Sequence, residues 1–489
     1  MSRAVSESGK RDAAAYLDAL PLARRQADAL IRIEETLAER NQCVAVIDDD
    51  PTGTQTVRNV PVLTQWSAEE LRAAVTDPAR VFFILTNSRS LPEAEAATVN
   101  EELGELLANV SEETGVDVRL ISRSDSTLRG HFPAETDALA RGWRSGGGAP
   151  IDSVILCPAF PEAGRIVAGG ELWVRQGQQL VPAAETEFAR DAAFGYSNSN
   201  LLAWAAEKLG DREPGSGSML DISIEDIRHD GPERVAQLLK STGPGSIVAV
   251  NAVDYADLEV FVLGLLAAEE AGKRFLYRTG PSFVSARSGN KGGVPLSTKE
   301  IYEGAEARDG NGLIVVGSYT RLTTDQLSKA VRVLGLEYVQ IDTNALLDER
   351  REEELSRVQD LVELSLHRGD VLVATGRKSV MGESPETSLE QGRSISDALV
   401  ELVCGLNPEM PLRYLVAKGG ITAHDLATQG LDAAKARVIG QMQEGMISLW
   451  RLDENSRRPD LPYVVFPGNV GDEDTLAEVL SVLREDPNA

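Results

Sequence analysis

Short runs of β-branched and aliphatic residues alternate with segments of helical spacing along most of this chain. The clearest of these runs are residues 44–47, 81–85, 118–121, 154–156, 313–316, 371–374, 414–417 and 463–466. Continuous apolar runs are typical of strands buried on both faces, and parallel strands need a helical crossover between them. The alternation therefore predicts an α/β fold with largely parallel sheets flanked by helices.

With 489 residues the chain is too long for one ordinary core, and it predicts two domains. A polar, glycine-rich stretch at residues 283–312 separates the two series of apolar runs, so we place the first domain at 43–290 and the second at 291–489. Helical spacing over residues 12–40 predicts a helix within an N-terminal helical extension, residues 1–42. This helix is either a packed accessory element or an oligomer contact, and the second interpretation implies a homodimer.

The charge balance, the cysteine positions and the lack of long apolar segments exclude several classes of protein. The formal net charge is -27, and such an acidic surface repels nucleic acid and anionic lipid. The three cysteines, at positions 43, 157 and 404, are too far apart for a metal-ligand motif or a disulfide framework. The N-terminus has no apolar signal segment, and no apolar run is long enough to span a bilayer. These features predict a cytoplasmic protein.

Aspartate, arginine and hydroxyl residues follow three strands of the first domain, at residues 48–56, 86–90 and 122–130. Because the carboxyl ends of parallel strands meet at one edge of a sheet, we expect these loops to form a ligand site. The alternative is structural: an aspartate at a strand end is often a helix N-cap, and Arg129 could pair with Glu135 on the following helix.

The charged groups in these loops point to an anionic ligand and to catalysis. Asp48, Asp49 and Asp50 repel one another unless a cation or a shared proton compensates. Arg89 and Arg123 offer planar forks for a carboxylate.

Glycine-rich turns follow four strands of the second domain. They contain Gly317-Ser318, Gly376, Gly419-Gly420 with Thr422, and Gly468-Asn469 with Gly471. Glycine lets backbone N–H groups approach phosphate oxygens, and a helix N-terminus just beyond such a turn attracts anions. The turns therefore predict a nucleotide site, with tight architectural turns as the alternative. No GxxxxGK[ST] motif is present, so the chain is not a P-loop protein.

Taken together these segments resemble the four-carbon acid sugar kinase family, which phosphorylates threonate, erythronate and oxo-tetronates. The segments that carry the resemblance are DDDPTGT at 48–54, RSDSTLRG at 123–130, PAFPEAGR at 158–165, ETEFARD at 185–191, and the turns at 317–318, 419–423 and 468–471. The order of the motifs matches the family over about residues 43–480. Four positions depart from the family's pattern: Pro51, Arg123, Ile421 and Phe466.

The resemblance implies a sugar-acid domain followed by an ATP domain, with the active-site cleft between them. It implies that Asp49, Arg89 and the segment Arg123, Ser124, Asp125 and Ser126 bind the substrate. The residues that it places at the nucleotide are Ser318, Gly376, Gly419, Gly420, Thr422, Gly468, Asn469 and Gly471. The implied cosubstrate and ion are ATP and Mg²⁺, with no metal ligand identified in the sequence.

The resulting hypothesis assigns a task to each charged group. Arg89 and Arg123 clamp the substrate carboxylate, and either Asp49 or Asp125 accepts the proton of the attacking hydroxyl. Glycine-turn amides and Mg²⁺ hold the ATP phosphates.

Two other functions fit parts of the sequence. The pattern of Asp48, Asp50 and Thr52, with Thr86 after the next strand, fits a haloacid-dehalogenase-type phosphatase, which leaves the glycine turns without a task. A non-catalytic sugar-acid sensor is the third interpretation, and the cluster of aspartates argues against it because anion binding needs no added negative charge.

Overall fold

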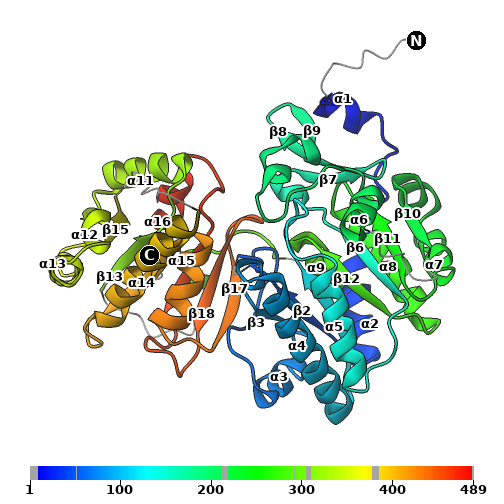
Figure 1. Ribbon diagram of the computed structural model, residues 1–489, viewed down its shortest axis with the longest axis horizontal. Helices are drawn as coiled ribbons and strands as arrows, with labels where there is room; N and C mark the ends of the chain where they lie inside the picture. The colour runs from blue at the N-terminus through cyan, green and yellow to red at the C-terminus, as the bar shows by residue number, and fades with distance from the viewer. Residues whose placement is uncertain are drawn as a thin grey trace. The chain divides into compact units, whose positions relative to one another are not determined.

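The computed structural model describes residues 9–50, 52–210, 218–290, 292–303, 310–376 and 385–486. The chain forms two compact units (Figure 1), residues 1–57 with 66–291 and residues 58–65 with 292–489. The segment 58–65 thus belongs to the second unit, although it lies in the sequence between two segments of the first unit. The domain boundaries at 42/43 and 290/291 stay predictions.

The first unit is built on a seven-stranded parallel sheet of order β10-β11-β6-β12-β5-β2-β4. Its strands are β2 (Gln42–Asp48), β4 (Val81–Leu85), β5 (Asp117–Arg123), β6 (Ser153–Cys157), β10 (Met219–Ile222), β11 (Ser246–Val250) and β12 (Phe275–Thr279). Strands β2, β4 and β12 are buried at every residue, and the apolar runs within β2 and β4 predict this burial.

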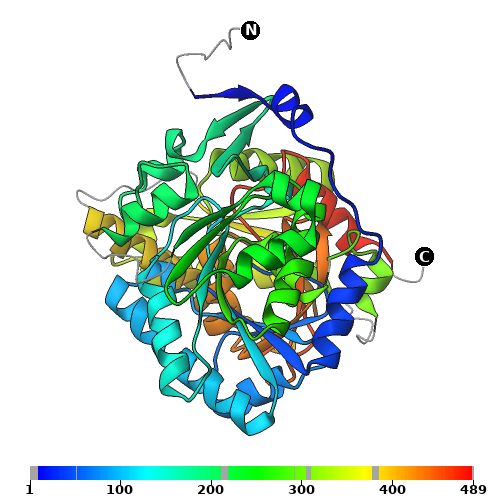
Figure 2. The same ribbon diagram turned by 90° about the vertical axis from the view of Figure 1, so that its right-hand side faces the viewer.

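Two groups of helices cover the two faces of this sheet (Figures 1 and 2). One group is α3 (Ala68–Val75), α4 (Glu93–Thr114) and α5 (Ala134–Ser145), and the other is α2 (Ala29–Glu39), α7 (Pro232–Lys240), α8 (Tyr255–Glu270) and α9 (Pro281–Ser288). The described part of the unit also contains α6 (Leu201–Leu209). A hydrogen bond from the Glu70 amide to the Ser67 hydroxyl caps α3.

A four-stranded antiparallel sheet of order β1-β9-β8-β7 adds to the first unit and was not predicted. Its strands are β1 (Arg11–Asp12), β7 (Arg165–Ala168), β8 (Glu171–Gln176) and β9 (Gln179–Pro182), and α1 (Ala13–Asp18) packs on it. The prediction of one helix over residues 12–40 is wrong, because α1 ends at Asp18 and α2 begins at Ala29. Pro21 explains the break, since proline disfavours helical backbone at the residue before it.

The second unit has a mixed sheet of order β3-β17-β18-β19-β16-β13-β15-β14, antiparallel from β3 to β19 and parallel from β19 to β14. Its strands are β3 (Val60–Leu63), β13 (Asn311–Val316), β14 (Glu337–Ile341), β15 (Val371–Thr375), β16 (Leu412–Lys418), β17 (Lys435–Gln443), β18 (Ile447–Leu452) and β19 (Pro462–Phe466). The helices are α10 (Thr298–Tyr302), α11 (Arg321–Leu334), α12 (Thr343–Leu346), α13 (Arg351–Leu366), α14 (Pro385–Gly405), α15 (Gly420–Asp425) and α16 (Thr475–Arg484).

The α/β class and the largely parallel pairing are confirmed in both units. Every one of the eight apolar runs forms the strand expected of it. Among the described helices none is both long enough and apolar enough to cross a membrane.

Candidate active site

The charged loops of the first unit meet because the strands that carry them are neighbours in the parallel sheet. Asp48 at the end of β2 is in register with Arg123 at the end of β5 and with Leu85 at the end of β4. Arg123 is in turn in register with Thr279 at the end of β12. The loops that leave these strands therefore emerge at one edge of the sheet, where ligands bind in this class of fold.

Asp48 and Arg123 form a buried ion pair beneath this edge. The Arg123 Nη1 donates to Asp48 Oδ1 at 2.8 Å, and the Asp48 side chain has no exposed surface. Burial raises the pKa of Asp48 to about 7, an effect that the Arg123 charge opposes and the neighbouring aspartates reinforce. Arg123 was predicted to be one half of a substrate clamp; here its guanidinium is bound to a protein carboxylate.

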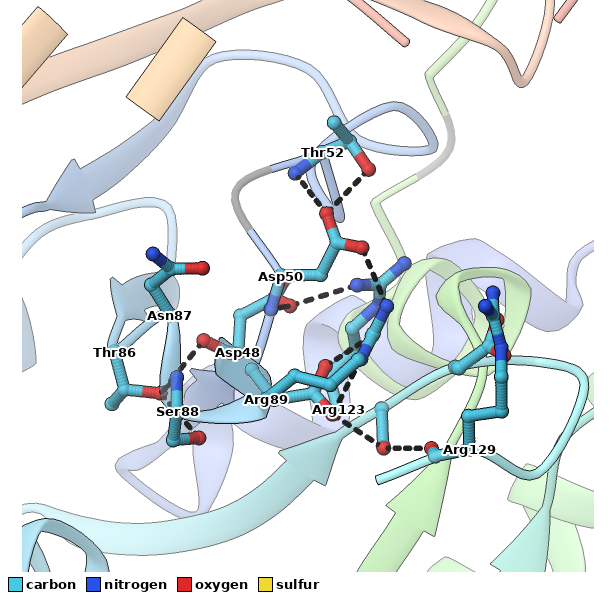
Figure 3. A network of polar contacts seen from close by, with 12 residues as sticks. Asp48, Asp50, Thr52, Thr86, Asn87, Ser88, Arg89, Arg123 and Arg129 are labelled. Atoms are coloured by element: carbon cyan, nitrogen blue, oxygen red, sulfur yellow. Dashed lines mark hydrogen bonds and ion pairs between the residues drawn. The ribbon is translucent and has the colours of Figure 1, made fainter. Parts of the chain in front are cut away.

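Asp49 is buried and lies at the centre of the network, part of which Figure 3 shows around Arg89. It accepts a hydrogen bond from Arg89 Nε at 3.2 Å, a second from Arg89 Nη2, and one from the Ser124 hydroxyl at 2.6 Å. Its own amide donates to the carbonyl of Arg123 at 3.2 Å. Asp49 thus joins the loops after β2, β4 and β5, and the predicted grouping of Asp49, Arg89 and Ser124 is present in the structure.

Asp50 completes the arginine contacts on the β2 side. Arg89 Nη1 donates to Asp50 Oδ2 at 2.6 Å, while the Thr52 amide and hydroxyl donate to Asp50 Oδ1 at 2.8 and 2.6 Å. Burial by itself raises the pKa of Asp50, but the charges of Arg89 and Arg123 and the Thr52 hydrogen bonds lower it to about 2. Arg89 is therefore shared by two carboxylates, and its side chain is only 17% exposed. Pro51 lies outside the described residues.

Asp125 has its own arginine. Arg129 Nε donates to Asp125 Oδ2 at 2.7 Å, and the Thr127 hydroxyl donates to the same oxygen. Although burial opposes it, the charges of Arg89 and Arg129 hold the pKa of Asp125 well below its ordinary value. The alternative pairing of Arg129 with Glu135 is wrong, because the Arg129 guanidinium turns back to its own loop.

Glu135 is instead the acceptor in a buried cluster that supports the Arg89 segment. It accepts hydrogen bonds from the Ser88 hydroxyl and, at 3.4 Å, from the Asn100 amide. Burial, reinforced by the charge of Asp49, raises the pKa of Glu135 to about 7. Ser88 directly precedes Arg89, so its hydrogen bond to Glu135 anchors the chain next to that arginine.

Arg278 at the end of β12 is a site residue that the sequence analysis missed. It is 2% exposed, and its Nη2 donates to the Ser124 hydroxyl at 3.3 Å and to the Arg129 carbonyl at 3.0 Å. A charged residue between the apolar run 275–277 and Gly280 is the signal that could have identified it. Ser126, predicted at the substrate, is buried in the same 124–130 loop.

In the second unit the turns after β13, β16 and β19 come together. The amides of Gly317 and Ser318 donate to the Lys418 carbonyl at 3.1 and 3.3 Å, and the Gly419 amide donates to the Phe466 carbonyl at 2.9 Å. A Cβ on Gly468 would lie 2.5 Å from the Ser318 hydroxyl.

Hydroxyl groups line these turns. The Thr323 hydroxyl donates to Ser318 Oγ at 3.0 Å and to the Gly468 carbonyl at 2.8 Å, and the Thr320 hydroxyl also donates to that carbonyl. Gly419 has φ +128°, a conformation that other residues rarely adopt, and a Cβ there would lie 3.0 Å from Thr422 Oγ1. This cradle of glycines and hydroxyls fits the phosphate groups of a nucleotide.

The other residues predicted at the nucleotide do not all lie in this cradle. Thr422 does not cap a helix, because α15 begins at Gly420 with Gly419 as its N-cap and no side-chain cap. Gly376 lies on the β14 side, where a Cβ would lie 3.1 Å from Thr343 Oγ1. Asn469 is exposed, and Gly471 adopts φ +77° beside Thr475 at the start of α16. Arg377 and Lys378, which follow Gly376, lie outside the described residues.

In comparisons with known proteins, two different domain families match the chain, and each match contains one of the two sites. The model of a sugar-binding N-terminal domain matches residues 44–287, and the model of a nucleotide-binding C-terminal domain matches residues 313–476. The chain belongs to the four-carbon acid sugar kinase family. The aspartate and arginine network thus lies within this family's sugar-binding domain, and the glycine turns lie within its nucleotide-binding domain.

The relatives cover nearly the whole chain. A D-threonate kinase from Bordetella bronchiseptica is 27% identical over 464 residues, 90% of this chain and 98% of that protein. A D-erythronate kinase from Heliobacterium modesticaldum is 26% identical over 83% of this chain and 81% of that protein. A solved structure from Salmonella typhimurium, 18% identical, covers 89% of this chain and 98% of its own with a TM-score of 0.65, and so shares the fold.

Proposed function

We propose that this protein is a kinase that transfers a phosphoryl group from ATP to a hydroxyl of a four-carbon sugar acid of the threonate, erythronate or oxo-tetronate type. The observation that carries the proposal is the presence of two different built sites in one chain of this family. One is an aspartate and arginine network in the sugar-binding domain, and the other is a glycine and hydroxyl cradle in the nucleotide-binding domain. D-threonate and D-erythronate kinases are relatives over most of its length.

Asp49 is our candidate for the group that accepts the hydroxyl proton. Asp125 is the weaker candidate, because the charges of Arg89 and Arg129 lower its pKa and make it a poor proton acceptor. Asp49 also lies where the loops of three strands converge, with Ser124 and Arg89 fixing both of its oxygens. Phosphoryl transfer depends chiefly on positioning and charge neutralisation, so the fixed position of Asp49 adds to the case for it.

On the nucleotide side, the turns at Gly317-Ser318, Gly419-Gly420 and Gly468 are proposed to receive the ATP phosphates, with the hydroxyls of Ser318 and Thr323 as further donors. The described residues contain no group of three or more His, Cys, Asp or Glu side chains that could hold a metal ion. Mg²⁺ commonly binds through phosphate oxygens and water with one or two carboxylates, which fits such a site. Bound in this way, it would neutralise charge on the phosphates.

The two rival functions fit the structure less well. The phosphatase needs Asp48 as a nucleophile, but that side chain is fully buried and bound to Arg123, while the Thr86 hydroxyl donates to the Asp48 carbonyl at 3.0 Å. A sensor would leave the second unit's cradle without a role. We also propose a cytoplasmic location, where ATP is available, and the homodimer stays a prediction that size-exclusion chromatography can test.

The test is a coupled ADP-release assay over four-carbon sugar acids and their keto forms, with and without added Mg²⁺. We expect ADP formation with at least one acid and a phosphorylated product by mass spectrometry. Phosphate release without ATP would instead establish the phosphatase. Binding of an acid without any turnover would establish the sensor.

A further inference from the structure

The arginines around the substrate site differ in whether they already have a carboxylate partner. Arg89, Arg123 and Arg129 each form ion pairs with aspartates. Arg165 and Arg278 form none with any residue that the structure describes. At Arg89, Arg123 and Arg129 a substrate carboxylate would have to compete with a protein aspartate, whereas at Arg165 and Arg278 it would not. The binding partner of the substrate carboxylate is therefore best sought at Arg165 or Arg278.

Arg278 is enclosed, and its Nη2 already has two neutral acceptors. Its guanidinium carbon lies 4.9 Å from the ring centre of Trp204 and 5.8 Å from that of Phe132. Its Nη2 hydrogen bonds go to Ser124 and to the Arg129 carbonyl. These contacts make it a support of the 124–130 loop.

Arg165 is different, because it is only half-buried and a ligand can reach it. It begins β7, and its Nη1 donates to the Ala163 carbonyl. Its Nε is shielded from water and has no acceptor among the described residues. An unmet donor of a charged, shielded group costs free energy that an anionic ligand would recover.

The surroundings of Arg165 place it beside the substrate loop. Its guanidinium carbon lies 5.8 Å from the ring centre of Phe188, and the Arg129 guanidinium lies 5.3 Å from the same ring. Arg129 in turn binds Asp125. Burial lowers the pKa of Arg165, and the charge of Asp125 opposes that shift, so the two groups are electrostatically coupled. Phe188 belongs to the 185–191 motif and Arg165 to the 158–165 motif, neither of which has a task in the mechanism so far.

We infer that Arg165 binds the carboxylate of the sugar acid, with the edge formed by Nε and Nη2 as the donor fork. This inference rests on the proposed function. The ligand is assigned as the substrate carboxylate and not the transferred phosphoryl group because Arg165 lies within the sugar-binding domain match. The Phe188 ring lies beside the Arg165 guanidinium and offers it a cation–π contact.

The experiment compares the wild-type chain with Arg165→Gln, Arg165→Lys and a control, Arg175→Gln. Arg175 is an exposed arginine on the neighbouring strand β8. Calorimetric titration without ATP measures binding of D-threonate, D-erythronate and the uncharged tetritols. We expect Arg165→Gln to weaken acid binding on the order of 100-fold and to leave tetritol binding unchanged. We expect Arg165→Lys to recover part of the loss and the control to match wild type.

Kinetics supply a second readout. The acid KM should rise in Arg165→Gln while kcat and the ATP KM stay near wild type, because the lost contact is present in both ground and transition states. Equal losses for acid and tetritol, a loss confined to ATP, or unchanged acid binding in a variant that is folded by circular dichroism would each overturn the inference.

The outcome is separable from that of the proposed function. If the wild type binds an acid but forms no ADP, the kinase proposal fails and the binding data alone decide the role of Arg165. If the wild type binds none of the acids, the inference fails. If Arg165→Gln does not fold, Arg165→Lys takes its place in the test, and the same comparison of acid affinity with tetritol affinity decides whether Arg165 binds the carboxylate.

Discussion

Replacing Arg89 by alanine tests whether the network around Asp49 is built as described. Arg89 makes two hydrogen bonds to Asp49 and one, at 2.6 Å, to Asp50, and its side chain is only 17% exposed. Removing one partner of a buried ion pair costs about 3–5 kcal/mol. Because Asp50 is one-quarter exposed and water can reach it, we expect the lower end, about 3 kcal/mol, in the unfolding free energy.

The assay is urea unfolding of Arg89→Ala, Asp50→Asn and the double variant, followed by tryptophan fluorescence. Arg89→Ala leaves Asp49 and Asp50 without this cation, and Asp50→Asn removes the charge of one of them. The loss of unfolding free energy in the double variant should therefore be about 1–2 kcal/mol smaller than the sum of the losses in the two single variants. Arg141→Ala is the control, since Arg141 pairs with Glu101 on an exposed surface, and we expect little change. Activity should also fall, through kcat and the acid KM together, with ATP affinity retained. An additive double variant, or a stability equal to that of the control, refutes the network.

Three further predictions address individual groups. Asp49→Asn should lower kcat by at least about 100-fold in a variant with a wild-type circular dichroism spectrum, and near-normal turnover would remove Asp49 from the mechanism. The pKa of Glu135 is raised to about 7 from 4.5, so the folded state holds a proton that the unfolded chain releases, and stability falls as pH rises between these values. The test compares the unfolding free energy at pH 5 with that at pH 8. In Glu135→Gln the decrease between the two pH values should be smaller than in the wild type by on the order of 2 kcal/mol, whereas in the exposed control Glu112→Gln it should be the same as in the wild type. Gly468→Ala should raise the ATP KM about 10-fold without changing the acid KM, because the added methyl group intrudes on a hydroxyl in the turn, and Gly369→Ala, where the added atom meets open space, should not.

Eight of the parallel-sheet strands could be predicted because a strand buried on both faces carries a run of apolar residues. Strands such as Val81–Leu85 and Val371–Thr375 show this pattern without interruption. The antiparallel strands could not, because half of the residues in a strand such as Glu171–Gln176 remain partly or fully exposed. The transfer of Val60–Leu63 to the second unit was also hidden, since it depends on pairing with Lys435–Gln443, far away in the sequence.

The positions of the site residues could be predicted better than their partners. Strand-end loops of a parallel sheet emerge at one edge, so the grouping of Asp49, Arg89 and Ser124 followed from the place of each residue just after a strand. Which carboxylate each arginine contacts depends on distances that the sequence does not contain. Arg123 therefore looked like a free fork, although it neutralises Asp48.

These pairings bear on how a chain with a formal charge of -27 could bind an anion. Aspartates pair with Arg89 and Arg123, so the contribution of these two arginines is geometric: they fix the orientation of the carboxylates, among them Asp49, the proposed proton acceptor. Attraction for the substrate must then come from cations without a protein counter-ion. The half-buried guanidinium of Arg165, next to the Phe188 ring, is such a cation, and water screens its charge only weakly. Separating the two tasks has a functional advantage. A carboxylate received at Arg165 does not compete for the hydrogen bonds that hold Asp49, so substrate binding would leave the proton acceptor in place for the transfer step.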